Sequence, residues 1–186
     1  MEFNDPIPGP EEIIVDVRAT AVNYVDLVLI GGTYQFRPEI PFVPGKGPAG
    51  VVKAVGENVH DFAPGDRVLA MAEQGGYAEF APIHRNNCYR LPDGLSFSDA
   101  ASMALVYDTA WFSLVERGRF EAGEAVLVLG ASGGVGLAAI QLVNALSGTA
   151  LAGIANPGKA DLVRDAGAAH IVDLAAGDLR NSLREQ

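Results

Sequence analysis

Apolar and polar residues alternate in part along the first half of the chain, and turn-forming residues separate the alternating segments. Each segment is short and is bounded by glycine or proline. Short segments of this kind are typical of strands in a small β-barrel or a folded sheet. Two helices are expected after the strands, over residues 98–105 and 108–116. The expected strands cover residues 12–19, 50–56, 66–71, 76–81 and 88–91.

Nearly continuous apolar runs replace this alternation in the second half of the chain. Such runs are typical of strands that are buried on both faces of a parallel sheet. Strand and helix alternate as in one half of a doubly wound α/β sheet with right-handed crossovers. We place the boundary between the β part and the α/β part near residues 105–123. The expected elements are strands over 125–129, 149–155 and 169–173 and helices over 135–146 and 159–166.

Charge is distributed unevenly along the chain. The net charge is −10, and residues 125–158 contain no Asp, Glu, Lys or Arg. A membrane-spanning helix needs about 20 predominantly apolar residues, and glycines and polar residues interrupt this stretch repeatedly, so we expect no span. An acidic chain without a run of basic residues is not typical of nucleic-acid binding. The acidic N-terminus has no apolar signal core, so we expect a cytoplasmic protein.

A glycine-rich loop follows the first apolar strand of the second half. Glycine allows a tight turn and a close approach of the backbone to a pyrophosphate, and the next helix directs N–H groups at the anion. The first glycine of the pattern G-x-G-x-x-G is replaced by alanine. Between a strand and a helix the loop predicts dinucleotide binding, and the alternative is a purely structural turn. The predicted cofactor-binding residues are Gly130, Ala131, Ser132, Gly133, Gly134, Val135 and Gly136.

The choice of cofactor depends on the residues after the second apolar strand. An NAD site usually has an acidic residue there, about 20 residues after the loop, which binds the adenosine ribose. Residues 154–159 contain no carboxylate. Asn156 can donate a hydrogen bond to a 2′-phosphate and Lys159 can neutralise it, although a lysine there can also be simply solvated. The sequence therefore favours NADPH over NADH.

A family resemblance follows from three segments of the sequence. Residues 123–141 closely resemble the signature of the zinc-free, zeta-crystallin-like quinone oxidoreductases of the medium-chain dehydrogenase/reductase superfamily. Residues 41–56 and 75–80 are similar to motifs of the family's first domain. The resemblance implies a GroES-like β-barrel catalytic domain over residues 1–110 and the first half of an NADP-binding Rossmann domain over residues 111–186. It also implies that a first strand and the later strands are missing, and that the full-length protein is a homodimer.

The same resemblance implies metal-free hydride transfer from NADPH to a quinone or an α,β-unsaturated carbonyl. Tyr34 is the candidate catalytic donor, because a neutral phenol can stabilise negative charge on the acceptor oxygen. The alternative for this residue is an aromatic ring that only packs beside a turn. Asn23 is expected to orient the nicotinamide ribose and Asp26 to fix the turn after it. Thr109 matches a family threonine near the nicotinamide.

Several positions depart from the family pattern. Gly47 stands where an acidic residue is expected, Asn144 where a basic residue or serine is usual, and Val28 where a second tyrosine is found. The single cysteine, Cys88, and the three histidines lack metal-ligand spacing, so we expect no metal. Two other interpretations remain open. One is a nucleotide-binding fragment without turnover, and the other is an enoyl-thioester reductase, in which only the acceptor differs.

Overall fold

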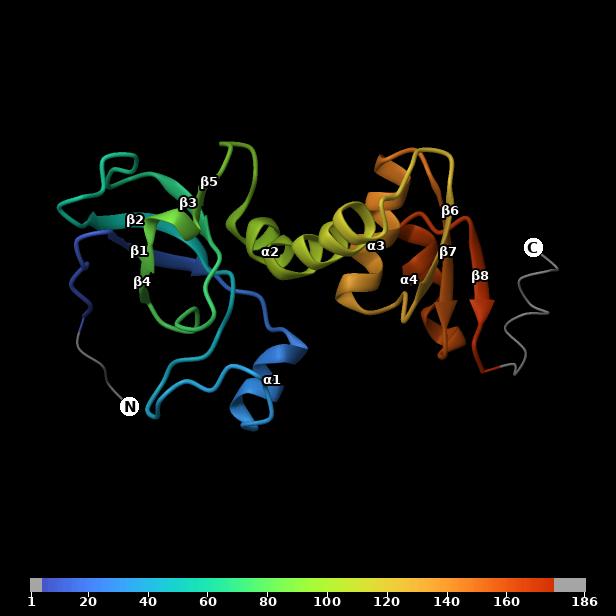
Figure 1. Ribbon diagram of the computed structural model, residues 1–186, viewed down its shortest axis with the longest axis horizontal. Coiled ribbons are helices and arrows are strands. Elements are labelled where there is room, and N and C mark those ends of the chain that lie inside the picture. The colour runs from blue at the N-terminus through green and yellow to red at the C-terminus, as the bar shows by residue number, and fades with distance from the viewer. Residues whose placement is uncertain (1–4, 176–186) are drawn as a thin grey trace. The chain divides into compact units, whose positions relative to one another are not determined.

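The computed structural model describes residues 5–175 of the chain, which fall into two compact units (Figure 1). The first unit is Met1–Leu105 and the second is Val106–Gln186. The division lies within helix α2 (Phe97–Trp111), at the start of the range in which we expected a domain boundary. We call these parts the first unit and the second unit, and each is described by itself.

The first unit is built around a five-stranded antiparallel sheet in the order β4-β1-β2-β3-β5. Strand β1 pairs with β2 on one side and with β4 on the other, so that Ile13 lies opposite both Val55 and Ile83. Their apolar side chains form one core cluster with those of the neighbouring strands. The strands are β1 (Glu12–Ala19), β2 (Ala49–Val55), β3 (Arg67–Ala70), β4 (Phe80–His84) and β5 (Cys88–Arg90).

The sheet must curl, because its two outer strands are consecutive in the chain. Strands β4 and β5 lie at opposite ends of the strand order, and the short 3-10 helix η1 (Arg85–Asn87) joins them. The outer strands of a flat five-stranded sheet would be about 19 Å apart. The four residue steps from His84 to Cys88 span at most about 14 Å. A short link is therefore compatible only with a sheet that folds back on itself, as in the barrel expected from the sequence.

Two expectations for the elements between residues 76 and 116 are wrong. The strand expected over 76–81 begins only at Phe80, because the N–H groups of Gly75, Gly76 and Tyr77 bond to carbonyl oxygens of residues 43–45 and form a turn there. The two helices expected over 98–105 and 108–116 form a single helix, α2, that continues into a π-helical segment, η2 (Phe112–Arg117). No glycine or proline interrupts the sequence between the two expected helices.

A short helix that the sequence pattern does not predict lies before the loop that carries Tyr34. Helix α1 (Tyr24–Ile30) begins with a cap, in which the backbone N–H of Asn23 donates to Oδ2 of Asp26 at 2.9 Å and the backbone N–H of Asp26 donates to the carbonyl of Asn23 at 3.0 Å. Six of its seven residues are apolar, and three of these, Tyr24, Leu27 and Ile30, are exposed. An amphipathic period is therefore missing, and the cap is the signal that marks this helix.

The second unit contains a parallel sheet in the order β6-β7-β8, with both crossover helices on one face (Figure 1). Buried aliphatic side chains of α3, including Ile140 and Val143, pack on the central strand β7. This is the strand–helix–strand–helix–strand order that the sequence predicts. The elements are β6 (Ala125–Leu129), α3 (Gly134–Ala145), β7 (Thr149–Ile154), η3 (Pro157–Lys159), α4 (Ala160–Asp165) and β8 (His170–Asp173).

Burial on both faces was expected for the first of these strands and is not found in the described residues. Val128 is the buried residue of β6, whereas Ala125 and Leu129 are exposed. Strand β6 is at the edge of the three described strands, and α3 and α4 cover one face of the sheet. The central strand β7 is buried at four of its six positions, as expected for a strand with two neighbours.

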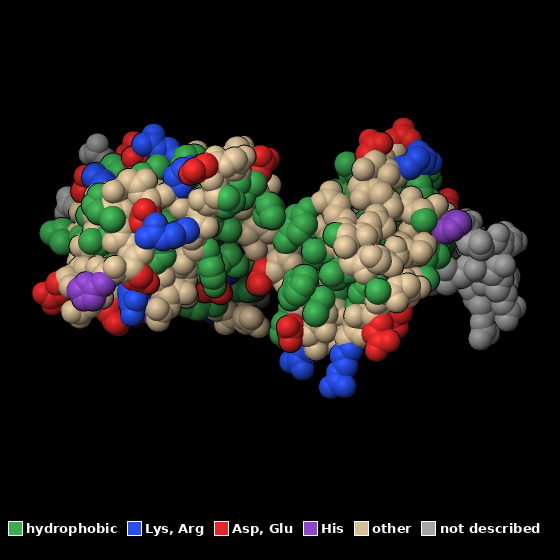
Figure 2. Space-filling view, turned by 90° about the horizontal axis from the view of Figure 1, so that it is seen from above, with side chains coloured by type: hydrophobic (Ala, Val, Ile, Leu, Met, Phe, Trp, Pro, Cys, Tyr) green, Lys and Arg blue, Asp and Glu red, His purple; other side chains and the backbone are tan. Residues whose placement is uncertain are grey.

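The surface carries dispersed charge. On the face that Figure 2 shows, lysine and arginine side chains are scattered among acidic ones over both units. Among the described residues, no helix is long and apolar enough to cross a membrane.

Candidate functional site

The glycine-rich loop of the second unit connects β6 to α3 and leaves space at its surface. Gly130 has a φ of +68°, and a Cβ there would meet nothing within 4 Å. A Cβ at Gly133 would meet one backbone oxygen at 3.5 Å. Gly136 differs, since its Cβ would lie 2.6 Å from the carbonyl oxygen of Gly130. The last glycine therefore lets the helix pack closely on the strand, and the earlier ones keep the surface of the loop open.

The start of α3 offers N–H groups to an anion. The helical hydrogen bonds begin with the N–H of Leu137, which donates to the carbonyl of Gly133, so the N–H groups of residues 134–136 have no partner within the helix. Gly133 occupies the N-cap position without a side-chain cap. An open loop of small residues before an uncapped helix fits a pyrophosphate. Ala131 and Ser132 complete the loop, the first buried and the second half-buried.

Asn156 and Lys159 follow the next strand of the same sheet. Strands β6 and β7 are parallel, with Leu129 opposite Gly153, so the segments that follow them leave the sheet at the same edge. The side-chain oxygen of Asn156 accepts from the N–H of Gly158 at 3.0 Å, which leaves the amide nitrogen as the donor toward a ligand. Lys159 is exposed. Both side chains therefore follow β7 at the edge of the sheet where β6 ends and the glycine loop begins.

Thr109 lies on the part of α2 that belongs to the second unit. Its neighbours Val106 and Ala110 pack on the core of that unit, and a Cβ at Gly134 would be 3.0 Å from the Val106 side chain. Thr109 itself is exposed, and its carbonyl accepts from Ser113. The helix that carries the predicted threonine therefore packs directly against the glycine loop.

In the first unit, the segment that carries Asn23 is held by a buried carboxylate. Asp26 is 1% exposed, and its Oδ2 accepts from the N–H of Asn23 at 2.9 Å and from the hydroxyl of Tyr77 at 2.8 Å. Its other oxygen, Oδ1, has no hydrogen-bond partner among the described residues. Burial, together with the neighbouring carboxylate, raises the pKa of Tyr77 to about 12. Asp26 thus fixes the turn after Asn23, as expected.

Tyr34 lies in a loop after α1 and is half-buried against a lysine. The ammonium group of Lys46 is 5.0 Å from the centroid of the Tyr34 ring, and the same group forms an ion pair with Glu73. Three segments far apart in the sequence meet here. The structure thus brings Tyr34 together with two charged residues that sequence reasoning did not single out. Asn23 precedes α1 and Tyr34 follows it, so this helix separates the two residues along the chain.

Two of the positions that depart from the family pattern, Gly47 and Asn144, have structural roles. Gly47 has a φ of +67°, and a Cβ there would lie 2.6 Å from that of Ala104 on α2, so an acidic side chain does not fit. The side-chain amide of Asn144 donates to the carbonyl of Gly167 at 2.8 Å. Cys88 is buried, and burial raises the pKa of its thiol to about 12. Within residues 5–175, no cluster of side chains could hold a metal ion.

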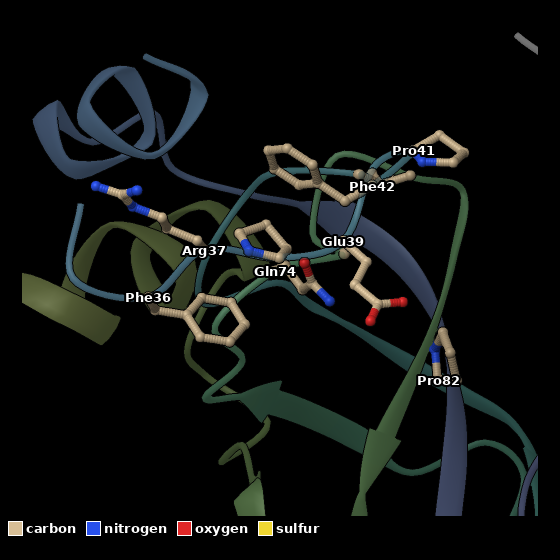
Figure 3. Close-up of a pocket in the computed structure, with 10 residues that line it drawn as sticks. Phe36, Arg37, Glu39, Pro41, Phe42, Gln74 and Pro82 are labelled. Atoms are coloured by element: carbon tan, nitrogen blue, oxygen red, sulfur yellow. The ribbon is translucent and has the colours of Figure 1, made fainter. Parts of the chain in front are cut away.

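A pocket of about 510 Å³ lies next to the loop that follows Tyr34. The rings of Phe36 and Phe42 stand on two sides of it, and Glu39 and Gln74 extend between them (Figure 3). Arg37 points away from these side chains, toward the neighbouring helix (Figure 3). None of the residues predicted as catalytic or cofactor-binding lines this pocket.

Sequence reasoning missed Lys46, Glu73 and Tyr77. A signal for Lys46 was present, because it is a lone lysine between two glycines in the motif where Gly47 replaces the expected acid. Tyr77 was part of a motif that carried the resemblance, but no partner for its hydroxyl could be assigned. Glu73 had no signal, since its contact depends on how two loops meet.

Known proteins match both units. The model of the alcohol dehydrogenase GroES-like domain matches residues 9–93. Human quinone oxidoreductase is 43% identical over 141 residues, which are 75% of this chain and 43% of that protein. Escherichia coli quinone oxidoreductase complexed with NADPH is 31% identical, with a TM-score of 0.90, over 100% of this chain and 57% of that one. The CurK enoyl reductase is 26% identical, with a TM-score of 0.84, over 93% and 54%.

These matches confirm the predicted fold, a GroES-like domain followed by the first half of a Rossmann domain. The chain spans about half the length of the proteins that it matches. The chain belongs to the medium-chain dehydrogenase/reductase superfamily, among its quinone oxidoreductase-like members.

Proposed function

We propose that this protein is an NADPH-dependent oxidoreductase that transfers hydride, without a metal, to a quinone or an α,β-unsaturated carbonyl. The observation that carries the proposal is the open glycine loop before the uncapped start of α3. It has the shape and the free N–H groups that a dinucleotide pyrophosphate requires. The complex of the similar Escherichia coli enzyme with NADPH supports this choice of cofactor.

Bound NADPH would supply a hydride, which the acceptor takes up together with one proton from solvent, giving NADP⁺ and a hydroquinone or a saturated carbonyl. The residues of the chain then have the task of placing the acceptor and stabilising its oxygen. Tyr34 donates a hydrogen bond to that oxygen, where negative charge develops. Asn23 orients the nicotinamide ribose, and Asp26 holds Asn23 in place through its backbone N–H.

Selectivity for NADPH would come from Asn156 and Lys159. The side-chain oxygen of Asn156 is occupied by the N–H of Gly158, so its amide nitrogen is directed to a ligand, and Lys159 is exposed. No carboxylate stands in residues 154–159 to bind a ribose 2′-hydroxyl or to repel a phosphate. Thr109 would contact the nicotinamide from α2.

An enoyl thioester is the second candidate acceptor. The likeness to the CurK enoyl reductase supports it, and the same hydride chemistry applies because only the acceptor differs. A third possibility follows from length, since the chain spans about half of its relatives and the substrate site of the whole protein can include other residues. In that case the 186-residue chain binds NADPH without turnover.

Absorbance of the reduced nicotinamide provides a direct test. We expect purified protein to oxidise NADPH with a simple quinone and to do so more slowly with NADH. Faster turnover of an enoyl thioester than of any quinone would support the second candidate. Tight NADPH binding without turnover of either acceptor by the 186-residue chain would support the third. Absence of NADPH binding would contradict all three.

We also propose the domain assignment, the oligomeric state and the localisation of the protein. We assign residues 1–110 to the catalytic domain and residues 111–186 to nucleotide binding. We also propose a homodimer for the full-length protein, in the cytoplasm, acting on a small molecule and not on nucleic acid. Size-exclusion chromatography with light scattering on the full-length protein would test the dimer.

A further inference from the structure

Lys46 is buried in a way that is unusual for a lysine. It is 5% exposed. Among the described residues, the only other charged side chain that is buried is that of Asp26. A lysine is almost never fully buried unless its charge is paired, because removal of the ammonium from water is costly. Its partner is Glu73, whose side chain is 62% exposed. The pair thus consists of a fixed interior cation and a hydrated carboxylate at the surface.

The backbone on both sides of Lys46 determines where its ammonium group lies. Gly45 and Gly47, its two neighbours, have φ values of +100° and +67°, which place the backbone in the left-handed region on both sides of Lys46. A Cβ at either glycine would lie 2.6 Å from another part of the first unit. The backbone is therefore enclosed, and Lys46 extends from it to the face of the Tyr34 ring.

Contact with an aromatic face gives the buried charge a second partner. At 5.0 Å from the ring centroid, the ammonium group is within the range of a cation–π interaction. Such an interaction favours one orientation of the ring, and Tyr34 lies in a loop without regular structure that needs some such restraint. It also holds a positive charge beside the tyrosine ring.

We propose that Lys46 is a positioning residue for Tyr34: its charge fixes the orientation of the ring and adds positive potential where the acceptor oxygen becomes negative. This inference rests on the role proposed above for Tyr34. A charge that is already in place when the reaction occurs stabilises the transition state without reorganisation. Glu73 pairs with the lysine from the water side. Gly47 matters as well, since no acidic side chain stands next to Lys46 there.

The chain offers a matched control for a lysine above an aromatic ring. Lys53 lies 3.3 Å from the centroid of the Phe80 ring, and its side chain is 46% exposed. It is in the same unit, on β2, and its ring partner has no proposed role in the reaction. Substitution of Lys53 by methionine thus removes an equal charge and a similar contact away from Tyr34.

The test combines a spectroscopic measurement with kinetics. NMR with ring-labelled tyrosine, in which Tyr34→Phe assigns the signal, should show that Lys46→Met shifts the Tyr34 resonance, that Lys46→Arg largely restores it, and that Lys53→Met leaves it in place. In NADPH–quinone turnover, Lys46→Met should lower kcat about tenfold with little change in KM. Lys46→Arg should recover most of this loss, and Lys53→Met should cause none.

A double-mutant cycle separates action through Tyr34 from a general structural role. In the Tyr34→Phe background, Lys46→Met should cause almost no further loss of kcat. An equal loss of kcat in both backgrounds would overturn the inference, as would an unmoved Tyr34 resonance in Lys46→Met. Normal turnover by Lys46→Met overturns it while leaving the proposed function intact. If the wild-type protein turns over no acceptor, the proposed function fails first, and the inference fails with it.

Discussion

Two glycine-rich turns in this chain use glycine for opposite reasons. In the first unit, a Cβ at Gly45 would lie 2.6 Å from the ring of Tyr77, and one at Gly47 would lie equally close to α2. In the second unit, a Cβ at Gly130 would meet nothing within 4 Å, and one at Gly133 would meet one oxygen at 3.5 Å. The protein itself fills the space beside the first turn. The space beside the second turn is left for a ligand.

This difference shows that the sequence of a glycine motif does not reveal whether the space beside each glycine is filled or open. Gly47 replaces an acidic residue of the family pattern, and the structure explains the change, because α2 occupies the space that a side chain would need. Ala131 replaces the first glycine of the dinucleotide pattern. That position is buried and its backbone is not in the left-handed region, so a methyl group is tolerated there. Substitutions at the first turn should therefore lower stability, and substitutions at the second should lower the affinity for the ligand.

The largest expected effect is a loss of stability at the filled turn. Gly45→Ala would place a Cβ against Tyr77 at a φ of +100°, so we expect the first unit to lose about 2–4 kcal/mol of unfolding free energy. Urea unfolding can be followed by the reactivity of Cys88, a thiol buried in this unit. Gly94→Ala is the control, because its Cβ would meet nothing within 4 Å. A loss at Gly45 no larger than at Gly94 would contradict the packing argument.

At the open turn we expect loss of affinity with little loss of stability. Gly133→Ala introduces a methyl group into space that the pyrophosphate is expected to use, so the Kd for NADPH should rise about tenfold, which corresponds to about 1.4 kcal/mol. The unfolding free energy should change by less than about 0.5 kcal/mol, because the nearest atom is 3.5 Å away. Titration calorimetry measures the first quantity, and unfolding followed by Trp111 fluorescence measures the second. Reduced stability with unchanged affinity would reverse the assignment of this turn.

A smaller effect is expected beside the open turn, at Lys159. Lys159→Met should weaken NADPH binding about fivefold and leave NADH binding unchanged, because an exposed lysine contributes on the order of 1 kcal/mol to a phosphate contact. Arg164→Met is the matched control, since it removes the same charge from α4, where Arg164 pairs with Asp161. Equal losses for NADPH and NADH would argue against a role for Lys159 in recognition of the 2′-phosphate.

The sequence predicted most elements because their signals are local. Strand alternation in the first unit and apolar runs in the second each depend on neighbouring residues, and the glycine loop is a contiguous motif. Helix α1 was not predicted, because exposed residues such as Leu27 and Ile30 remove the amphipathic period. The cap formed by Asn23 and Asp26 is the local signal that could have located it.

The surroundings of Tyr34 could not be predicted for a different reason. The contacts of this ring depend on Lys46 and, through it, on Glu73, which the tertiary fold brings together from three separate loops. Conversely, the fourth expected strand, over residues 76–81, was placed too early in the chain. Residues 75–77 satisfy the backbone groups of residues 43–45, and alternation within one segment does not reveal such a long-range turn. Local pattern therefore predicts elements better than it predicts the contacts between loops.

The smallest expected effect concerns pH and the ring that fills the first turn. The pKa of Tyr77 rises from 10.0 to about 12 in the folded protein, chiefly because of burial and then because its hydroxyl donates to Asp26. The folded state therefore holds this proton more tightly than the unfolded state, and the resulting stability is complete below about pH 10 and is lost between about pH 10 and 12. We expect less than about 1 kcal/mol, since Tyr77 is 39% exposed.

Urea unfolding at several alkaline pH values, compared between wild type and Tyr77→Phe, isolates this contribution. The fall in stability between pH 10 and 12 should be shallower in Tyr77→Phe, because the variant has no proton to lose at this site. Tyr89→Phe serves as the control, since Tyr89 is more than half exposed and should leave the slope unchanged. Parallel slopes for wild type and Tyr77→Phe would mean that the hydrogen bond to Asp26 does not hold the proton. The filled turn would then be stabilised by packing on Gly45 alone.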